Sequence, residues 1–108
     1  MPVIDKKSIA VLPFVNLSND INNVYFCDGL TEEIINALAS IKVLLVTSRT
    51  SSFYFKNKKV TSKEIREKLK VATFIEGSVR TSKNKMRITV QMIDALDDFH
   101  FWSETFDR

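Results

Sequence analysis

The side chains that could do chemistry in this chain are few and lie far apart in the sequence. His100 is the only histidine and Cys27 the only cysteine, so no cluster of imidazole and thiolate ligands can hold a metal ion. Asp97 and Asp98 fall in a predicted turn, where aspartates usually accept hydrogen bonds from local N–H groups. The two glycines are too isolated to cradle a phosphate. We therefore predict no catalytic residue, no metal and no cofactor for this chain, which is not expected to be an enzyme itself.

One polar and aromatic segment is the best candidate for binding. In SRTSSF, residues 48–53, hydroxyl side chains flank Arg49 and could bind an anion together with its guanidinium group. Loop composition alone would give the same pattern. The segment follows the carboxyl end of a predicted strand, where α/β sheets tend to bind ligands. We choose Arg49, Thr50, Ser51 and Phe53 as the predicted ligand- or partner-binding surface.

The positive charge is concentrated in one stretch of the chain. Residues 56–87 hold eleven Lys and Arg against three Glu, whereas the remainder holds five basic and ten acidic residues, for a net charge of +3. A solvated face explains such a stretch, and so does an anionic partner. The predicted basic patch comprises Lys56, Lys58, Lys59, Lys83 and Lys85. Since no nucleic-acid-binding motif is present, the alternative function, not the leading one, is a nucleic-acid-binding or regulatory domain of a transcriptional regulator that uses the basic stretch 56–87.

The elements that must position these residues begin with SIAVLPFVN, residues 8–16. From Ile9 to Val15 every residue is apolar, which is typical of a central strand covered on both faces. Pro13 lacks a backbone donor and should lie near the strand's end or beside a bulge. A strand at 43–47 follows an intervening helix, so the three elements predict a parallel βαβ unit.

Two helices are predicted. The first begins near Asp28, or earlier around Asn23, and carries an apolar stripe at helical spacing that comprises Leu30, Ile34, Leu38 and Ile41. The segment between it and the second helix is expected to be a loop or a single helical turn after residue 47, pinned by Phe53 or Phe55. The second helix starts with a capping box, Thr61 to Glu64, and ends near Lys70. Val60 and Ile65 occupy the positions of a hydrophobic staple.

The last third of the chain alternates apolar and polar residues, which indicates half-buried strands. FIEGSVR and KMRITVQMID form a hairpin around residues 81–84, and FHFWSETF adds a third antiparallel strand. The predicted fold class is α/β (α+β), a mixed sheet of about five strands in the order β-α-β-α-β-β-β with two helices on one face. The other face must then be covered by something else, such as Phe101 and Trp102.

Six segments together resemble one bacterial family along nearly the whole chain from Ser8. They are SIAVLPFVNLS, YFCDGLTEEIINAL, VTSRTSSFYFK, FIEGSVR, RITVQMIDA and FWSETFDR. The chain is similar to the TolB amino-terminal-like domains, which are related to the flagellar FlgO domain. The resemblance implies an α/β fold and a module inside a longer protein. Its companions would be class III adenylate or guanylate cyclase domains, winged-helix transcriptional regulators, kinases or tetratricopeptide repeats. It supplies no catalytic residue.

These observations give one set of expectations. Residues 1–7 are expected to be a disordered or cloning-derived tail, and 8–108 a single domain cut from a longer protein. Its function is expected to be that of a non-catalytic interaction or sensory module of a bacterial signalling protein, such as a membrane-associated cyclase. Its partners would be neighbouring domains or another protein, with a homodimer left open. Any membrane contact would come from a segment outside this chain, on the cytoplasmic or the extracytoplasmic side of the inner membrane.

Overall fold

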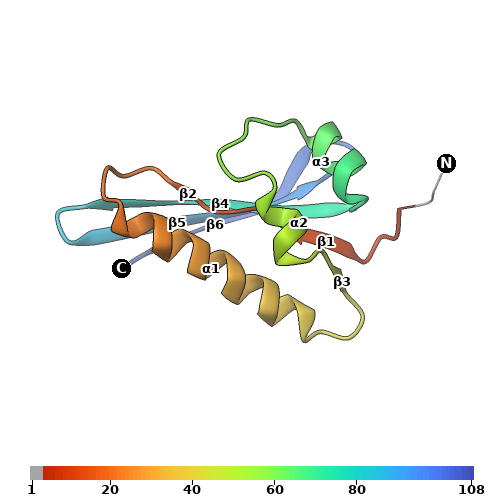
Figure 1. The fold of residues 1–108 in the computed structure, drawn as a ribbon, viewed down its shortest axis with the longest axis horizontal. Helices are drawn as coiled ribbons and strands as arrows, with labels where there is room; N and C mark the ends of the chain where they lie inside the picture. The colour runs from red at the N-terminus through yellow and green to blue at the C-terminus, as the bar shows by residue number, and fades with distance from the viewer. Residues whose placement is uncertain (1–3) are drawn as a thin grey trace.

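The elements follow the predicted order, with one strand divided and one short helix added (Figure 1). The computed structural model describes residues 4–108. Its elements are β1 Ser8–Val11, β2 Val15–Asn16, α1 Asn22–Ala39, β3 Leu45–Val46, α2 Arg49–Phe53, α3 Ser62–Leu69, β4 Thr73–Ser82, β5 Lys85–Asp94 and β6 Phe99–Asp107. The strand predicted across residues 9–15 is interrupted at Pro13, as expected of a residue without a ladder donor, and resumes as β2.

The strands form the mixed sheet that the sequence predicts. Its order is β3-β1-β4-β5-β6, and β2 extends the line of β1 beside β4. β1 pairs in parallel with both β3 and β4, which confirms the βαβ unit. β4, β5 and β6 are antiparallel neighbours. Lys83 and Asn84 join β4 to β5 with positive φ angles of 47° and 66°, the left-handed pair that a tight two-residue hairpin turn requires.

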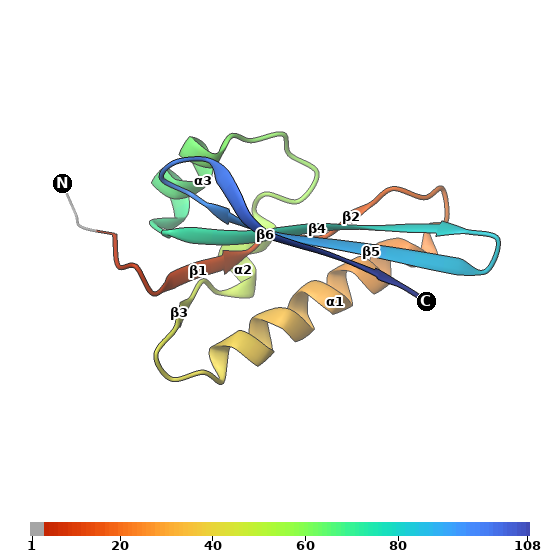
Figure 2. The same cartoon turned by 180° about the vertical axis from the view of Figure 1, so that it is seen from behind.

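The two faces of the sheet are covered by different helices, which corrects the prediction that both helices share one face. Alternate residues of β1 enter two separate cores. Ile9 and Val11 pack with α1, while Ala10 and Leu12 pack with Phe55 and α3. Figures 1 and 2 show α1 on one side of the sheet and α3 on the other.

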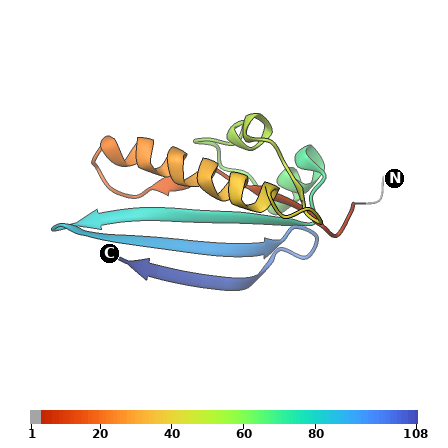
Figure 3. The same cartoon turned by 90° about the horizontal axis from the view of Figure 1, so that it is seen from below.

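Chain topology explains this arrangement. The connection from β1 to β3 moves one way across the sheet, and the connection from β3 to β4 returns past β1 to its other side. Because parallel crossovers are right-handed, connections in opposite directions place their helices on opposite faces. Phe101 and Trp102, proposed above as a cover, are instead exposed on β6, which forms one edge of the sheet (Figure 3).

Helix α1 begins at Asn22, near the earlier of the two predicted starts, and its most buried stripe lies beside the predicted one. Its buried residues lie four apart: Asn23, Cys27, Thr31 and Ile35. Leu30, Ile34 and Leu38 flank that stripe and are partly buried, whereas Ile41 lies beyond the helix and is exposed. The fully buried Thr31 hydroxyl accepts a hydrogen bond from Phe14 N–H at 3.0 Å and donates one to the Cys27 carbonyl at 2.7 Å. Thr31 thus fixes α1 to the chain where β1 ends.

Helix α3 starts as its sequence predicts. Thr61 is the N-cap, and its hydroxyl accepts a hydrogen bond from Glu64 N–H at 3.1 Å. The return contact of the capping box has another form, because the Glu64 carboxylate accepts from the Thr61 hydroxyl at 3.3 Å. Val60 and Ile65 pack in the same core, and Lys70 ends the helix with a left-handed φ of 57°.

The segment before β1 differs in part from the predicted tail. Residues 1–3 lie outside the described residues. Asp5 to Lys7 form a turn, since Ser8 N–H donates to the Asp5 carbonyl at 3.0 Å and Lys7 N–H to the Asp5 carboxylate at 2.8 Å. The Lys7 carbonyl also accepts from Leu45 N–H at 3.0 Å, which ties this turn to β3.

Candidate functional site at the carboxyl end of the central strand

The topology opens a space beyond the carboxyl end of β1. The connection after β1 leads to β3 on one side, and the connection after β3 leads back past β1 to β4 on the other side. A point where successive connections run in opposite directions is where open α/β sheets bind ligands. Here a cavity of about 590 Å³ lies between the segment Leu12–Asn16, the first half of α1, and the segment 55–60 that leads into α3. This size is within the range of small-molecule sites.

The cavity has an apolar wall and a charged rim. Its apolar lining includes Val24 and four residues of the two cores, which are Leu12, Phe14, Phe55 and Ile65. The charged residues around it are Asp28, Lys56, Lys58, Lys59 and Glu76. An apolar pocket with a few convergent polar groups is the usual form of a binding site.

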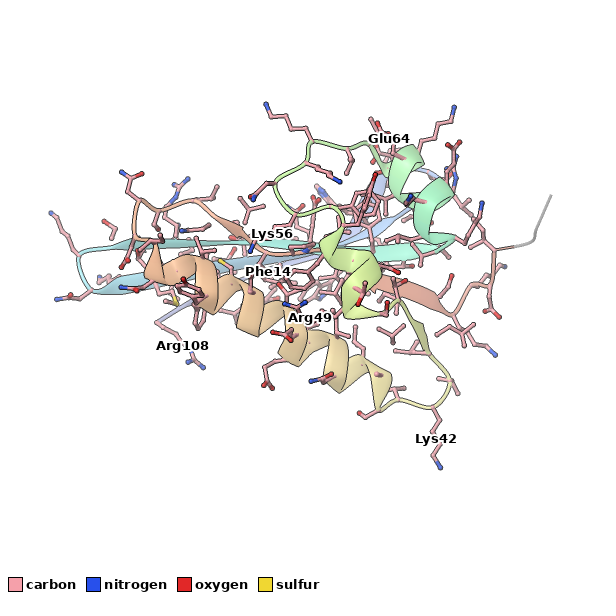
Figure 4. The ribbon with its side chains drawn as sticks, viewed as in Figure 1. Phe14, Lys42, Arg49, Lys56, Glu64 and Arg108 are labelled. Atoms are coloured by element: carbon pink, nitrogen blue, oxygen red, sulfur yellow. The ribbon has the colours of Figure 1, made fainter. Side chains whose placement is uncertain are left out.

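Two ion pairs fasten the segment after β3 to α1, and Figure 4 labels their basic members, Arg49 and Lys56. Arg49 Nε lies 2.8 Å from Glu32 Oε1, and Lys56 Nζ lies 2.5 Å from Asp28 Oδ2. Asp28 and Glu32 are four residues apart, so they project from neighbouring turns of one helix face. The Arg49 guanidinium also stacks on the Phe53 ring, 4.2 Å from its centroid. The two acidic residues of α1 therefore hold α2 and the chain that follows it.

The predicted binding surface forms helix α2, one of the two forms expected for it. Ser48 caps α2 by accepting a hydrogen bond from Ser51 N–H at 3.3 Å. Arg49, Thr50 and Ser51 are exposed, and Phe53 packs partly against the α1 core. The structure thus brings Arg49 and Phe53 into contact with each other and leaves two hydroxyls beside them in solvent. Their role in binding stays a prediction.

The predicted basic patch is divided between two places. Lys56, Lys58 and Lys59 border the cavity, whereas Lys83 and Lys85 lie at the β4–β5 turn, at the far end of the molecule (Figure 1). Lys58 Nζ also lies 3.4 Å from the centre of the Tyr54 ring, a cation–π contact. The five lysines therefore do not form one surface.

The other candidate side chains have structural surroundings. Cys27 is buried in the α1 core, and burial, together with the nearby Asp28 charge, raises the pKa of its thiol. His100 is exposed on β6, and Asp97 lies in a turn in which its N–H donates to Asp94. Among residues 4–108 no group of three or more His, Cys, Asp or Glu side chains could hold a metal ion.

Sequence reasoning missed Asp28 and Glu76 as site residues. Asp28 Oδ1 is buried and has no hydrogen-bond donor among residues 4–108. The contact partner of its other oxygen, Lys56, is 28 residues away in the chain, so no local spacing connects them. Glu76 faces the α3 side of β4, and burial is the main cause of its raised pKa, followed by the negative charge of Asp98.

The raised pKa of Glu76 gives a pH prediction. A carboxyl whose folded pKa exceeds its unfolded pKa favours folding only while it is protonated, so its contribution is lost as pH rises from the unfolded to the folded value. Glu76→Gln should therefore be more stable than the wild type at neutral pH. The difference should disappear in acid below the unfolded pKa. Urea denaturation of both proteins across this range measures it, and a stability gap that widens toward low pH would contradict the prediction.

Comparison with known proteins agrees with this architecture. At 16% identity and a TM-score of 0.75, lipoprotein GNA1162 from Neisseria meningitidis shares the fold over 94% of this chain and 79% of its own. The C-terminal domain of LpoB from Escherichia coli does so at 17% identity and a TM-score of 0.73, over 98% and 84%. TolB from Acinetobacter baumannii matches at 15% identity and a TM-score of 0.59, over 92% of this chain and 22% of TolB. The resemblance to TolB is therefore shown for the fold alone.

The fold is that of a small domain built on one mixed sheet with helices packed on both faces. Residues 5–108 match the model of the HilA/YgeH-like transcriptional regulator second domain, and the chain belongs to that family. It is also 46% identical over 103 residues to the protein of Rhizobium meliloti (strain 1021) named "Putative adenylate cyclase 3". That match covers 95% of this chain and 18% of the relative, so the chain spans about a fifth of its length. No helix within residues 4–108 is long and apolar enough to cross a membrane.

Proposed function

We propose that this domain is a non-catalytic recognition module within a multidomain bacterial signalling protein. One observation carries the proposal: a single domain type is found in a family named for transcriptional regulators and in a small part of a relative named for adenylate cyclase. The two names imply different outputs, transcription in one case and cyclic nucleotide synthesis in the other. A domain type common to both is best explained by a role in controlling the output in response to a signal or a partner. The partners proposed are neighbouring domains of the longer chain or another protein.

The recognition surface we propose is α2 with its ion pair to α1. Arg49 is held in place by Glu32 and the Phe53 ring, and it stays exposed at 51% of its side-chain surface. An arginine that is already ordered loses less conformational entropy when it binds. Arginine and aromatic side chains also dominate the energetics of many protein interfaces. Thr50 and Ser51 add exposed hydroxyls to the same helix.

The test uses the complete natural protein that carries this domain. Arg49→Ala and Phe53→Ala should each weaken partner binding by at least about tenfold, the effect of an interface hot spot, and should change the signalling output. The output is cyclic nucleotide synthesis for a cyclase and transcription for a regulator. Lys42→Ala is the matched control, because Lys42 is exposed and lies away from Arg49 (Figure 4). Unchanged binding and output in both variants, with the fold intact, would refute the proposed surface.

Nucleic-acid binding through the basic stretch stays the second candidate, favoured by the family's transcriptional name. The division of the five lysines between two places argues against it, since a backbone-tracking surface needs its cations together. A homodimer also stays a prediction, and β6 is exposed along its whole length as a free edge strand.

A further inference from the structure

We propose that the cavity beside β1 binds a small carboxylic acid that carries an adjacent hydrogen-bond donor, that is, an amino acid or a hydroxy acid with a short apolar side chain. The inference rests on the proposed recognition function, because it names what the module would sense. It uses the cavity residues and not the α2 surface, so the two proposals can be tested separately.

The requirement for a donor comes from Asp28. Its Oδ2 is satisfied by Lys56 Nζ at 2.5 Å, and its Oδ1 is buried without a donor among residues 4–108. A buried carboxylate oxygen that lacks a donor is costly, so a ligand that supplies an N–H or O–H group to it gains affinity. Asp28 lines the cavity and 22% of its side-chain surface is exposed, so the carboxylate must turn to present this oxygen to an occupant.

The requirement for an acid comes from the charges around the cavity. Lys56, Lys58 and Lys59 line it together with Asp28 and Glu76, so the basic groups outnumber the acidic ones by one. Lys56 is paired with Asp28, whereas Lys59 is exposed and belongs to none of the three ion pairs among residues 4–108. A ligand carboxylate directed toward Lys59 would balance the excess positive charge of the cavity lining.

The requirement for a short apolar part comes from the remaining wall. Phe14, Val24 and Phe55 line the cavity beside the charged groups, and Phe14 and Phe55 are held in the two cores. Gly77 lies against the Phe14 ring, which fixes the position of that ring. An aliphatic side chain placed on these residues buries apolar surface while its polar head meets Asp28 and Lys59.

Four probes that share the isobutyl group of leucine separate these requirements. L-Leucine and 2-hydroxy-4-methylpentanoate carry both the acid and the donor, 4-methylpentanoate lacks the donor, and 3-methylbutylamine lacks the acid. Calorimetric titration of the 108-residue chain should show the first two binding about tenfold or more tightly than the others, the effect of one charge-assisted hydrogen bond. A preference between the first two identifies the donor as ammonium or hydroxyl. Equal affinity for all four probes, or no binding of leucine and the hydroxy acid at millimolar concentration, would overturn the proposal.

Two variants test which cavity residue binds which group of the ligand. Asp28→Asn should remove the advantage of leucine over 4-methylpentanoate, and Lys59→Gln should weaken every carboxylate equally without changing that ratio. Glu33→Gln is the matched control, since Glu33 is exposed on α1 and does not line the cavity. Circular dichroism establishes that each variant is folded. An unchanged leucine preference in folded Asp28→Asn would refute the assignment. Loss of partner binding in Arg49→Ala with normal leucine binding would leave this proposal standing. Failure of the wild type to bind leucine, with partner binding lost in Arg49→Ala, would overturn this proposal and leave the α2 surface standing.

Discussion

Gly77→Ala is expected to lower the free energy of unfolding by about 3 kcal/mol, the upper part of the range for overpacking a core. A Cβ atom at this position would meet the Phe14 ring and would lie 2.5 Å from the Thr89 carbonyl oxygen. The ring is buried at 4% exposure and the carbonyl belongs to the neighbouring strand β5, so neither can move without disturbing the sheet. Chemical denaturation followed by circular dichroism measures the loss.

The other glycine of this chain provides the matched control. Gly29 is inside α1, and a Cβ atom there would meet nothing within 4 Å. Alanine has the higher helix propensity, so Gly29→Ala should raise the free energy of unfolding by about 0.5–1 kcal/mol. The two substitutions are chemically identical and should act with opposite signs. A Gly77→Ala protein as stable as the wild type would show that Phe14 does not pack against β4 as described.

Phe74→Ala should cost about 4 kcal/mol, because it removes the largest fully buried side chain and leaves a cavity that the strands cannot close. Phe74 is 2% exposed and packs with Ala10, Ile65 and Phe55 on the α3 side of the sheet. This substitution therefore tests the finding that the second face of the sheet is covered by α3. Thermal and urea denaturation should agree on the loss.

A second phenylalanine shows what an exposed ring contributes. Phe101 on β6 is 59% exposed, so Phe101→Ala should change the free energy of unfolding by less than about 0.5 kcal/mol. If Phe74→Ala cost no more than Phe101→Ala, the α3 face would not be a packed core. The sheet would then need some other cover on that side, as the sequence alone had suggested.

Local sequence signals predicted those features that depend on neighbours in the chain. The apolar run from Ile9 to Val15 predicted a strand buried on both faces, and Pro13 predicted its interruption. Thr61 and Glu64 predicted the start of α3. In each case the determining contacts lie within a few residues, so the pattern and its structural cause are visible together.

Features that depend on distant residues were not predicted. The helices lie on opposite faces because of the strand order β3-β1-β4, which no periodicity reveals. The pairing of Lys56 with Asp28, the orphan oxygen of Asp28 and the contact of Gly77 with Phe14 each join segments from separate elements. The position of Arg49 and Phe53 just after a strand end is visible in the sequence. Their mutual stacking and the role of Glu32 required the structure.

The central claim is that recognition takes place at the carboxyl end of β1 and not at the hairpin tip. Backbone amide ¹H–¹⁵N spectra of the labelled domain, alone and within the complete natural protein, test it most directly. The signals expected to shift belong to α2 and the cavity, residues 49–60, with Leu12–Asn16 and the first half of α1. Shifts gathered at residues 83–85 of the β4–β5 turn, with residues 49–60 unchanged, would contradict it.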